Sequence, residues 1–330
     1  MTTSRTVSTL AAIAALALAT TSVALDQTSA QASVAAAPAA EPTRQATKPS
    51  PQSQRQPAST ESYAYRWPVK PFDRQHPVRG FFGDPRIANH GESRQFHFGI
   101  DISAPNGMPV YATLTGRVYI HPLHETTIAV VAPDGTEFSY WHVVPVVRTG
   151  ERVVAYETVI GHIEAPYGHV HFSERVGGRY LNPLRRGALG PYSDMTTPLV
   201  RSAVLRANGS LVGEAYDETP LAVPRPWYDL PVMPAVVRWR LVDRHGKAVV
   251  GWTTTVDFRL TIPAASEFDR IWAPGVSQNH VRAPGRFCLT LATTVQLHAI
   301  RPGRYTVEVA VTDTRGNGSR SRIPLTLSDA

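Results

Sequence analysis

HFGIDISA at residues 97–104 and HVHFSERV at residues 169–176 are two runs in which polar and apolar residues alternate. Such alternation is typical of a β-strand with one buried face, because successive side chains of a strand point to opposite sides. Similar short runs lie between residues 109 and 163, and glycine turns such as Asp134-Gly135 separate them. The pattern predicts antiparallel β structure for residues 61–187.

A second set of alternating runs lies in residues 199–330, among them AVVRWRLVD at residues 235–243 and RYTVEVAVTD at residues 304–313. Their period of two, with turns between the runs, is typical of an immunoglobulin-like β-sandwich, here without the paired cysteines of antibody domains. Residues 188–198 show no sustained pattern and are predicted to connect the two domains. Two domains also suit the length, since 330 residues exceed what one ordinary core holds. The predicted fold class is therefore all-β.

The first 60 residues have the composition of a signal peptide and a linker rather than of a folded domain. Arg5 precedes the apolar run at residues 10–19, and small residues follow at 22–24, so residues 1–24 are predicted to be a signal peptide. Residues 25–60 are rich in Ala, Pro, Ser and Gln and predict a disordered linker, because they offer too little apolar area to offset the entropy of ordering. No later run approaches the ~20 apolar residues of a spanning helix, so we expect an exported chain without a transmembrane helix.

The histidines are concentrated in the first predicted domain, since nine of the twelve lie between residues 76 and 171. The single cysteine, Cys288, permits neither an internal disulfide nor a multi-cysteine metal site, and we expect it to be a small buried apolar residue. A metal site in this chain must therefore rest on histidines and carboxylates.

Two evenly spaced pairs, His97 with Asp101 and His169 with His171, lie in runs with strand character. Even spacing on a strand places both members of a pair on one face, so two such strands would direct all four side chains toward one cleft. The residues between them are then expected to face the core on the other side: Phe98, Ile100 and Val170.

Zinc in a hydrolase usually has three protein ligands and leaves a fourth position for water, and two histidines with one aspartate meet that number. The sequence has no HExxH motif and therefore lacks the glutamate base of that metalloprotease class. Neutral imidazoles can move the proton instead. His142 and one member of the His169/His171 pair are available for that task.

The motifs HFGID at 97–101, YWH at 140–142 and HVHF at 169–172 resemble, in this order, those of the lysostaphin-type (LytM-like) zinc endopeptidases, which cut peptidoglycan peptides. The resemblance extends over residues 66–184. It implies an antiparallel β-sheet peptidase domain with Zn2+ as its cofactor. The residues that it implies are His97, Asp101 and His171 as zinc ligands, with His142 and His169 as the pair that orients or deprotonates the water and stabilises the oxyanion.

The chain departs from the family pattern beside the last motif. Residues 164–168, EAPYG, replace the usual Gly/Thr-rich loop, and Ser173 stands where a Glu is frequent. That loop borders the substrate groove in the family, so the sequence leaves the cleaved bond open.

The sequence therefore predicts an exported zinc metalloendopeptidase that hydrolyses peptide bonds in peptidoglycan. Two alternatives stay open: a catalytically silent LytM-like module that binds the wall or regulates an amidase, and a zinc protease that acts on proteins. The second domain shows no cluster of residues that proposes chemistry, and its role is open as well.

Charge and export bear on the expected partners and location. The formal net charge of +7 favours polyanionic surroundings. We expect peptidoglycan peptides and an anionic cell-wall polymer as partners, at a secreted or wall-associated location in a bacterium. Nucleic acid is not expected, because the chain lacks interleaved aromatic and basic positions.

The histidines without a patterned partner are expected to be ordinary hydrogen-bonded residues: His76, His90, His121, His124, His162, His245, His280 and His298.

Overall fold

A computed structural model describes residues 62–87 and 94–328. The predicted signal peptide and linker lie outside these residues, as does His90. Within the described residues, no helix has the length and apolar character that crossing a membrane requires.

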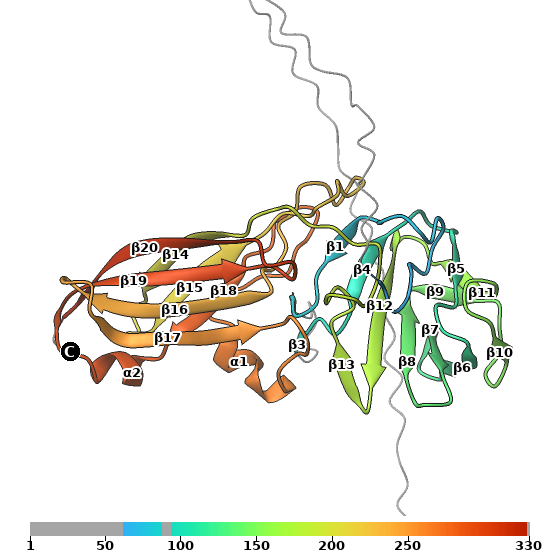
Figure 1. The fold of residues 1–330 in the computed structure, drawn as a ribbon, viewed down its shortest axis with the longest axis horizontal. Coiled ribbons are helices and arrows are strands. Elements are labelled where there is room, and N and C mark those ends of the chain that lie inside the picture. The colour runs from blue at the N-terminus through green and yellow to red at the C-terminus, as the bar shows by residue number, and fades with distance from the viewer. Residues whose placement is uncertain (1–61, 88–93, 329–330) are drawn as a thin grey trace, which may run out of the picture. The chain divides into compact units, whose positions relative to one another are not determined.

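The larger sheet of the N-terminal half is antiparallel and has β12 near its centre, between β4 and β8 (Figure 1). A short strand, β13 (Arg179–Leu181), pairs with the far end of β12. The sheet order is β1 (Val78–Gly80), β4 (Ile100–Ser103), β12 (His169–Val176), β8 (Glu137–Trp141), β7 (His124–Val131), β6 (Gly116–His121) and β10 (Arg152–Val153).

Two smaller sheets complete this half. One has the order β5 (Pro109–Tyr111), β11 (Val159–Ile163) and β9 (Val143–Pro145), and the other pairs β2 (Pro85–Arg86) with β3 (Gln95–Phe96). The apolar positions of the alternating runs form the core, as the side chains of Ile100, Val170 and Phe172 are fully buried. Burial of these apolar side chains stabilises the sheet by removing apolar area from water.

The C-terminal half consists of two further antiparallel sheets, with Trp239, Leu241 and Val309 in its core. Cys288 is fully buried, as predicted. One sheet has the order β14 (Leu199–Leu205), β15 (Leu211–Tyr216), β18 (Cys288–Ala292), and the other the order β17 (Ala248–Asp257), β16 (Val236–Asp243), β19 (Gly303–Thr312), β20 (Gly318–Leu327). Its helices are short: η1 (Ala265–Glu267), α1 (Phe268–Ile271) and α2 (Thr294–His298).

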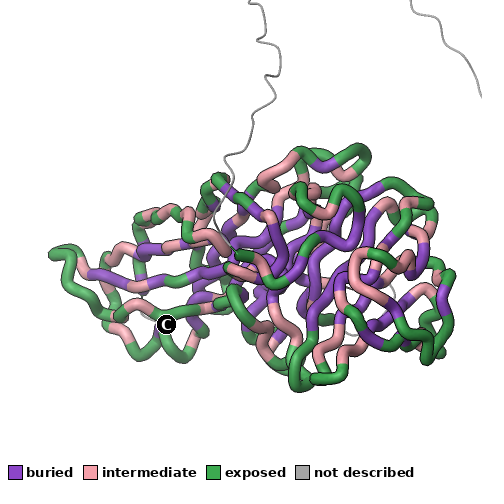
Figure 2. The backbone as a smooth tube through the Cα atoms, turned by 45° about the vertical axis from the view of Figure 1, so that its right-hand side comes forward, coloured by how far each residue is buried: buried purple, intermediate pink, exposed green. Residues whose placement is uncertain are grey.

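The structure confirms the all-β, antiparallel fold class. Figure 2 shows buried residues concentrated in the interior of the tube and exposed residues at its outer turns. The immunoglobulin-like assignment of residues 199–330 stays a prediction, as do the exact domain boundaries.

The chain before β1 is fastened to the segment that follows β13. The amide nitrogen of Tyr65 donates to the carbonyl of Ala188, and the indole Nε1 of Trp67 donates to the carbonyl of Pro191. The Tyr65 hydroxyl also donates to Glu174 on β12 at 2.5 Å. Tyr65 and Trp67 are buried, so these two side chains belong to the core of this half.

Candidate metal centre

Strands β4 and β12 bring two of the predicted ligands together. Asp101 and His171 are directly opposite each other in the antiparallel register, and His169 is opposite Ser103. Val170, between the two histidines, is fully buried on the other face. The strand pair expected from the spacing is therefore present, and it directs both histidines to the side of Asp101.

His97 reaches the same point from outside β4, so the prediction that it shares a strand with Asp101 was wrong. It lies between β3 and β4, where its amide nitrogen donates to the carbonyl of Asp84 and its own carbonyl accepts from Gly83, both at 2.8 Å. Its Nδ1 lies 2.8 Å from the carbonyl of Phe81. This contact places the ring proton on Nδ1 and leaves the Nε2 lone pair free to bind a metal.

Phe98 also differs from the prediction, because it does not face the core. It is half-buried, and its ring contacts those of His171, Trp141 and Tyr180. The following residue, Gly99, explains the difference, since a Cβ there would lie 2.4 Å from the carbonyl oxygen of Phe172. The close approach to β12 therefore requires glycine, and Phe98 lies before β4, where the alternation of a strand does not apply.

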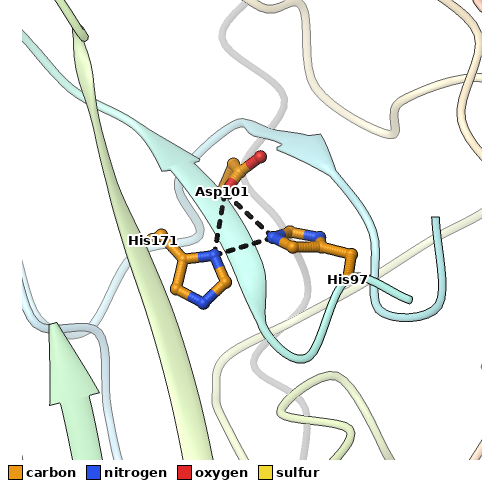
Figure 3. Close-up of side chains that lie close together, drawn as sticks. All are labelled: His97, Asp101 and His171. Carbon is orange, nitrogen blue, oxygen red and sulfur yellow. Dashed lines mark hydrogen bonds and ion pairs between the residues drawn. The ribbon is translucent and has the colours of Figure 1, made fainter. Parts of the chain in front are cut away.

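Three donor atoms converge at the centre of this arrangement (Figure 3). His97 Nε2 lies 2.7 Å from His171 Nδ1, and the two nitrogens lie 3.1 and 3.2 Å from Asp101 Oδ1. Ligand atoms of a tetrahedral zinc ion, at roughly 2.0–2.2 Å from the metal, are about 3.3 Å apart. We call His97, Asp101 and His171 the metal centre, because this donor set and spacing could hold a metal ion.

Burial and nearby charges give the metal centre the protonation states that a metal requires. Burial lowers the pKa of His97 to about 3 and also lowers the pKa of His171, so both rings are neutral at neutral pH. Burial alone would raise the pKa of Asp101, but the positive charge of His97 in its protonated form and of the Arg86 guanidinium outweighs it and holds that pKa well below its ordinary value. Neutral imidazoles and an ionised carboxylate are the forms that bind metals.

The other two predicted residues, His142 and His169, lie beside the metal centre. His169 Nε2 is 3.6 Å from Asp101 Oδ1, and the ring of His142 lies 4.7 Å from that of His169. His142 separates β8 from β9 with a φ of +62°, a backbone conformation that is uncommon for a residue with a Cβ. Its ring stacks on Tyr167, and burial lowers the pKa of His142 to about 4 and that of His169 to about 3.

An arginine that the sequence did not single out fixes the tautomer of His169. Arg79 Nη2 lies 2.6 Å from His169 Nδ1, which is also 3.0 Å from the carbonyl of Tyr167. Because a guanidinium only donates, the shorter contact makes Nδ1 an acceptor and places the ring proton on Nε2, the nitrogen near Asp101. The guanidinium of Arg79 stacks on the indole of Trp227, 3.9 Å from the ring centroid.

Sequence reasoning missed Arg86, Arg79 and Trp227. Arg86 Nη2 donates to Asp101 Oδ2 at 2.6 Å, and the signal for it was the segment GFFGDPR, which the resemblance included without assigning a role. Trp227 carried no signal, because it comes from the connection between β15 and β16.

A groove lies beside the metal centre, and two of its lining residues, Phe98 and Trp141, contact the ring of His171. His124, which the sequence left as an ordinary histidine, contacts the ring of Trp141 and so borders this groove. The groove holds both aromatic rings and a carboxylate. Its lining includes Phe98, Tyr119, His124, Glu137, Trp141 and Tyr180.

Comparison with protein families finds one match, in which residues 95–183 fit peptidase family M23. The matched segment contains the metal centre together with His142 and His169, and it confirms the LytM-like resemblance predicted from the motifs. It supports a peptidase-like function. The curated proteins give no match to this chain.

Three solved structures are similar to part of the chain. A zinc-containing peptidase from Vibrio cholerae is 25% identical, with a TM-score of 0.31, over 38% of this chain and 40% of that one. The catalytic domain of the prophage-encoded M23 protein EnpA from Enterococcus faecalis, in a variant form, is 24% identical, with a TM-score of 0.27, over 35% and 95% of the two chains. The complex of SpoIIIAH and SpoIIQ contains a chain that is 23% identical, with a TM-score of 0.29, over 36% and 97%.

Proposed function

From the match to peptidase family M23, we propose that this chain is a zinc metalloendopeptidase that hydrolyses peptide bonds in peptidoglycan. The observation that carries the proposal is the convergence of His97 Nε2, Asp101 Oδ1 and His171 Nδ1, with two further neutral imidazoles beside them. This is the residue set of an open catalytic metal site rather than of a closed structural one, which usually has four protein ligands.

His97, Asp101 and His171 would hold the ion. Zinc, when bound, lowers the pKa of a bound water to roughly 7 and polarises the carbonyl group that is attacked. Arg86 keeps the Asp101 carboxylate ionised and oriented, and the carbonyl of Phe81 orients His97 in the same way. Such outer contacts fix the direction in which the ligands point.

The two remaining histidines take different roles in this proposal. His169 donates a hydrogen bond from Nε2 to the oxyanion of the tetrahedral intermediate, because Arg79 occupies its Nδ1. His142 accepts the proton of the attacking water, since its ring is neutral and accepts no hydrogen bond from an arginine in the described residues. The stacking of His142 on Tyr167 fixes the plane of the ring before substrate binds.

The groove beside the metal centre suits an extended peptide. Aromatic rings on its floor offer apolar contact, while Glu137 and Arg175 at its far end form an ion pair at 3.6 Å and offer both signs of charge. Tyr167, from the loop that departs from the family pattern, stacks on His142. A peptide would lie across the metal with chain on both sides, as an endopeptidase requires.

Export and wall contact belong to the same proposal. The predicted signal peptide and linker would deliver the enzyme outside a bacterial cell, as a secreted or wall-associated protein. The net charge of +7 supports attraction to an anionic wall polymer.

The test is hydrolysis of isolated peptidoglycan by the purified chain, with mass analysis of the released fragments. We expect new amino groups, about one zinc per chain as an open site requires, and loss of release in a His142→Ala variant that keeps its zinc. Stoichiometric zinc without release would instead identify a silent binding module. Cleavage of casein without cleavage of the wall would identify a protease of proteins.

A further inference from the structure

Three buried carboxyl groups meet in the C-terminal half, far along the chain from the metal centre. Asp194 precedes β14, Asp217 follows β15 directly, and Asp313 follows β19 directly. One oxygen from each lies within 4.8 Å of the others, and their exposed fractions are 6, 1 and 3%. We call these three residues the acidic cluster.

The hydrogen bonds of the acidic cluster leave one oxygen without a partner. Asp313 Oδ1 accepts from three backbone amides of its hairpin, and Asp194 accepts from Thr196 and from the hydroxyl of Tyr192. Asp217 Oδ1 accepts the amide of Glu218. The Thr196 hydroxyl is close enough to lower the pKa of Asp217, but it donates to Asp194 Oδ1 and the carbonyl of Glu218, and Asp217 Oδ2 is buried with no hydrogen-bond partner among the described residues. A carboxylate oxygen removed from water needs a proton donor or a cation, so this atom points to a missing ligand.

The arginines near the acidic cluster do not pair with its carboxylates. No ion pair in the described residues includes any of the three carboxylates. The nearest arginine, Arg315, directs its guanidinium to the carbonyls of Leu184 and Tyr192, and Arg186 donates to the carbonyl of Arg315. Three mutually repelling carboxylates in a buried position therefore lack an internal counterion.

The ligand atoms that the acidic cluster offers favour calcium. All three side chains offer only oxygen, without the nitrogen or sulfur donors that zinc prefers. Calcium has 6–8 oxygen ligands at roughly 2.3–2.6 Å in a flexible geometry, and carboxylates are among the ligands that it prefers. Magnesium requires near-ideal octahedral geometry and usually keeps several waters.

We propose that Asp194, Asp217 and Asp313 form a calcium site that joins three separate segments of the C-terminal half. Asn317 already bridges two of these segments, since its Nδ2 donates to the carbonyl of Asp194 and to Asp313 Oδ2. An ion here ties the segment entering β14 to the β19–β20 hairpin and to the chain leaving β15. The alternative occupant of the position is a proton shared among the carboxyl groups, in keeping with burial that raises the pKa of Asp217 to about 7.

The experiment uses the full chain with zinc held constant, so that the metal centre stays loaded. Tb3+ is the first probe, because the Tyr192 hydroxyl lies 3.0 Å from Asp194 Oδ2 and can sensitise a bound lanthanide. We expect Tb3+ emission that Ca2+ displaces, one Ca2+ per chain by calorimetry, and a melting temperature that rises with the logarithm of the Ca2+ concentration. Asp217→Asn should weaken Ca2+ binding at least tenfold.

Two control variants test whether Ca2+ binds at the acidic cluster. Asp134→Asn changes an exposed turn aspartate that accepts the amide of Thr136, and it should leave Ca2+ binding unchanged. His171→Ala should likewise keep the Ca2+ response, which separates the acidic cluster from the metal centre.

Several outcomes would overturn the proposal. Wild-type protein that neither binds Ca2+ nor melts at a higher temperature with it, combined with a more stable Asp217→Asn variant, would show a shared proton instead. Equal Ca2+ affinity in Asp217→Asn and wild type would place the ion elsewhere. Mg2+ binding as tightly as Ca2+ would refute the choice of ion. If Asp217→Asn fails to fold, the wild-type Ca2+ titration still decides.

Discussion

The metal centre and the acidic cluster are both buried groups of three ionisable side chains, but they balance charge in different ways. In the metal centre, two rings are neutral through burial and the one carboxylate has Arg86 as a partner. In the acidic cluster, three carboxylates face one another without an ion pair among the described residues. The metal centre is therefore close to neutral before an ion binds. The acidic cluster, by contrast, needs a bound cation or a proton to balance its charge.

The substitution with the largest expected effect changes the metal centre and leaves the acidic cluster intact. Asp101→Ala removes the charged member of the metal centre, and we expect activity to fall at least about 1000-fold with loss of bound zinc. The Ca2+ response of the melting temperature should remain. Zinc content and hydrolysis, measured on the same preparation, check this, and full activity in Asp101→Ala would refute the assigned ligand set.

His142→Ala separates proton transfer from metal binding. Loss of a positioned general base typically costs 10²–10⁴-fold in rate, and we expect a fall in kcat within that range. Zinc content should match wild type, because His142 lies outside the metal centre. Simultaneous loss of zinc would show that His142 is a ligand and that the division of roles given above is wrong.

Arg86→Ala tests the charge balance directly. Removal of an outer partner of a metal ligand typically costs 10–100-fold in affinity or activity, and we expect zinc to dissociate more readily by that factor. Arg86→Lys restores the charge without the planar fork and should recover part of the affinity. A competition titration with a zinc chelator measures both variants. Unchanged affinity in Arg86→Ala would mean that the metal centre does not need this partner.

The smallest effect concerns Trp227, whose ring supports Arg79. A cation–π contact contributes roughly 0.5–2 kcal/mol, so Trp227→Ala should lower kcat by no more than about 30-fold and leave zinc content unchanged. Arg79→Ala should give an equal or larger loss. If the indole acts only through Arg79, the double variant should lose no more than Arg79→Ala alone. Additive losses would show that Trp227 contacts the substrate independently.

The β-runs and the ordered histidine motifs could be predicted because each depends on local information. Alternation within residues 169–176 separates an apolar side of β12 from a polar one, and the structure agrees, since Val170 and Phe172 are fully buried on the side opposite the two histidines. The same rule failed at Phe98, because the alternation of a strand does not apply to the tight passage that precedes β4.

Other features had no local signal at all. The acidic cluster combines residues from three runs without any shared motif, and its members meet only after β14, β15 and β19 have taken their places. Trp227 reaches Arg79 from a connection whose path no periodicity describes. Contacts between residues so far apart in the sequence depend on how the whole core packs. Local patterns in a single sequence therefore do not predict them.

The hydrogen bonds that join residues 65–67 to the chain beyond β13 have a practical consequence for anyone who expresses the N-terminal half alone. The family match begins at residue 95, yet cutting there would discard Trp67, and losing a fully buried tryptophan side chain costs about 3–5 kcal/mol. That is a large share of the 5–15 kcal/mol by which a typical domain stays folded. A self-sufficient fragment should begin before residue 64 and extend past Pro191, where the two flanks meet.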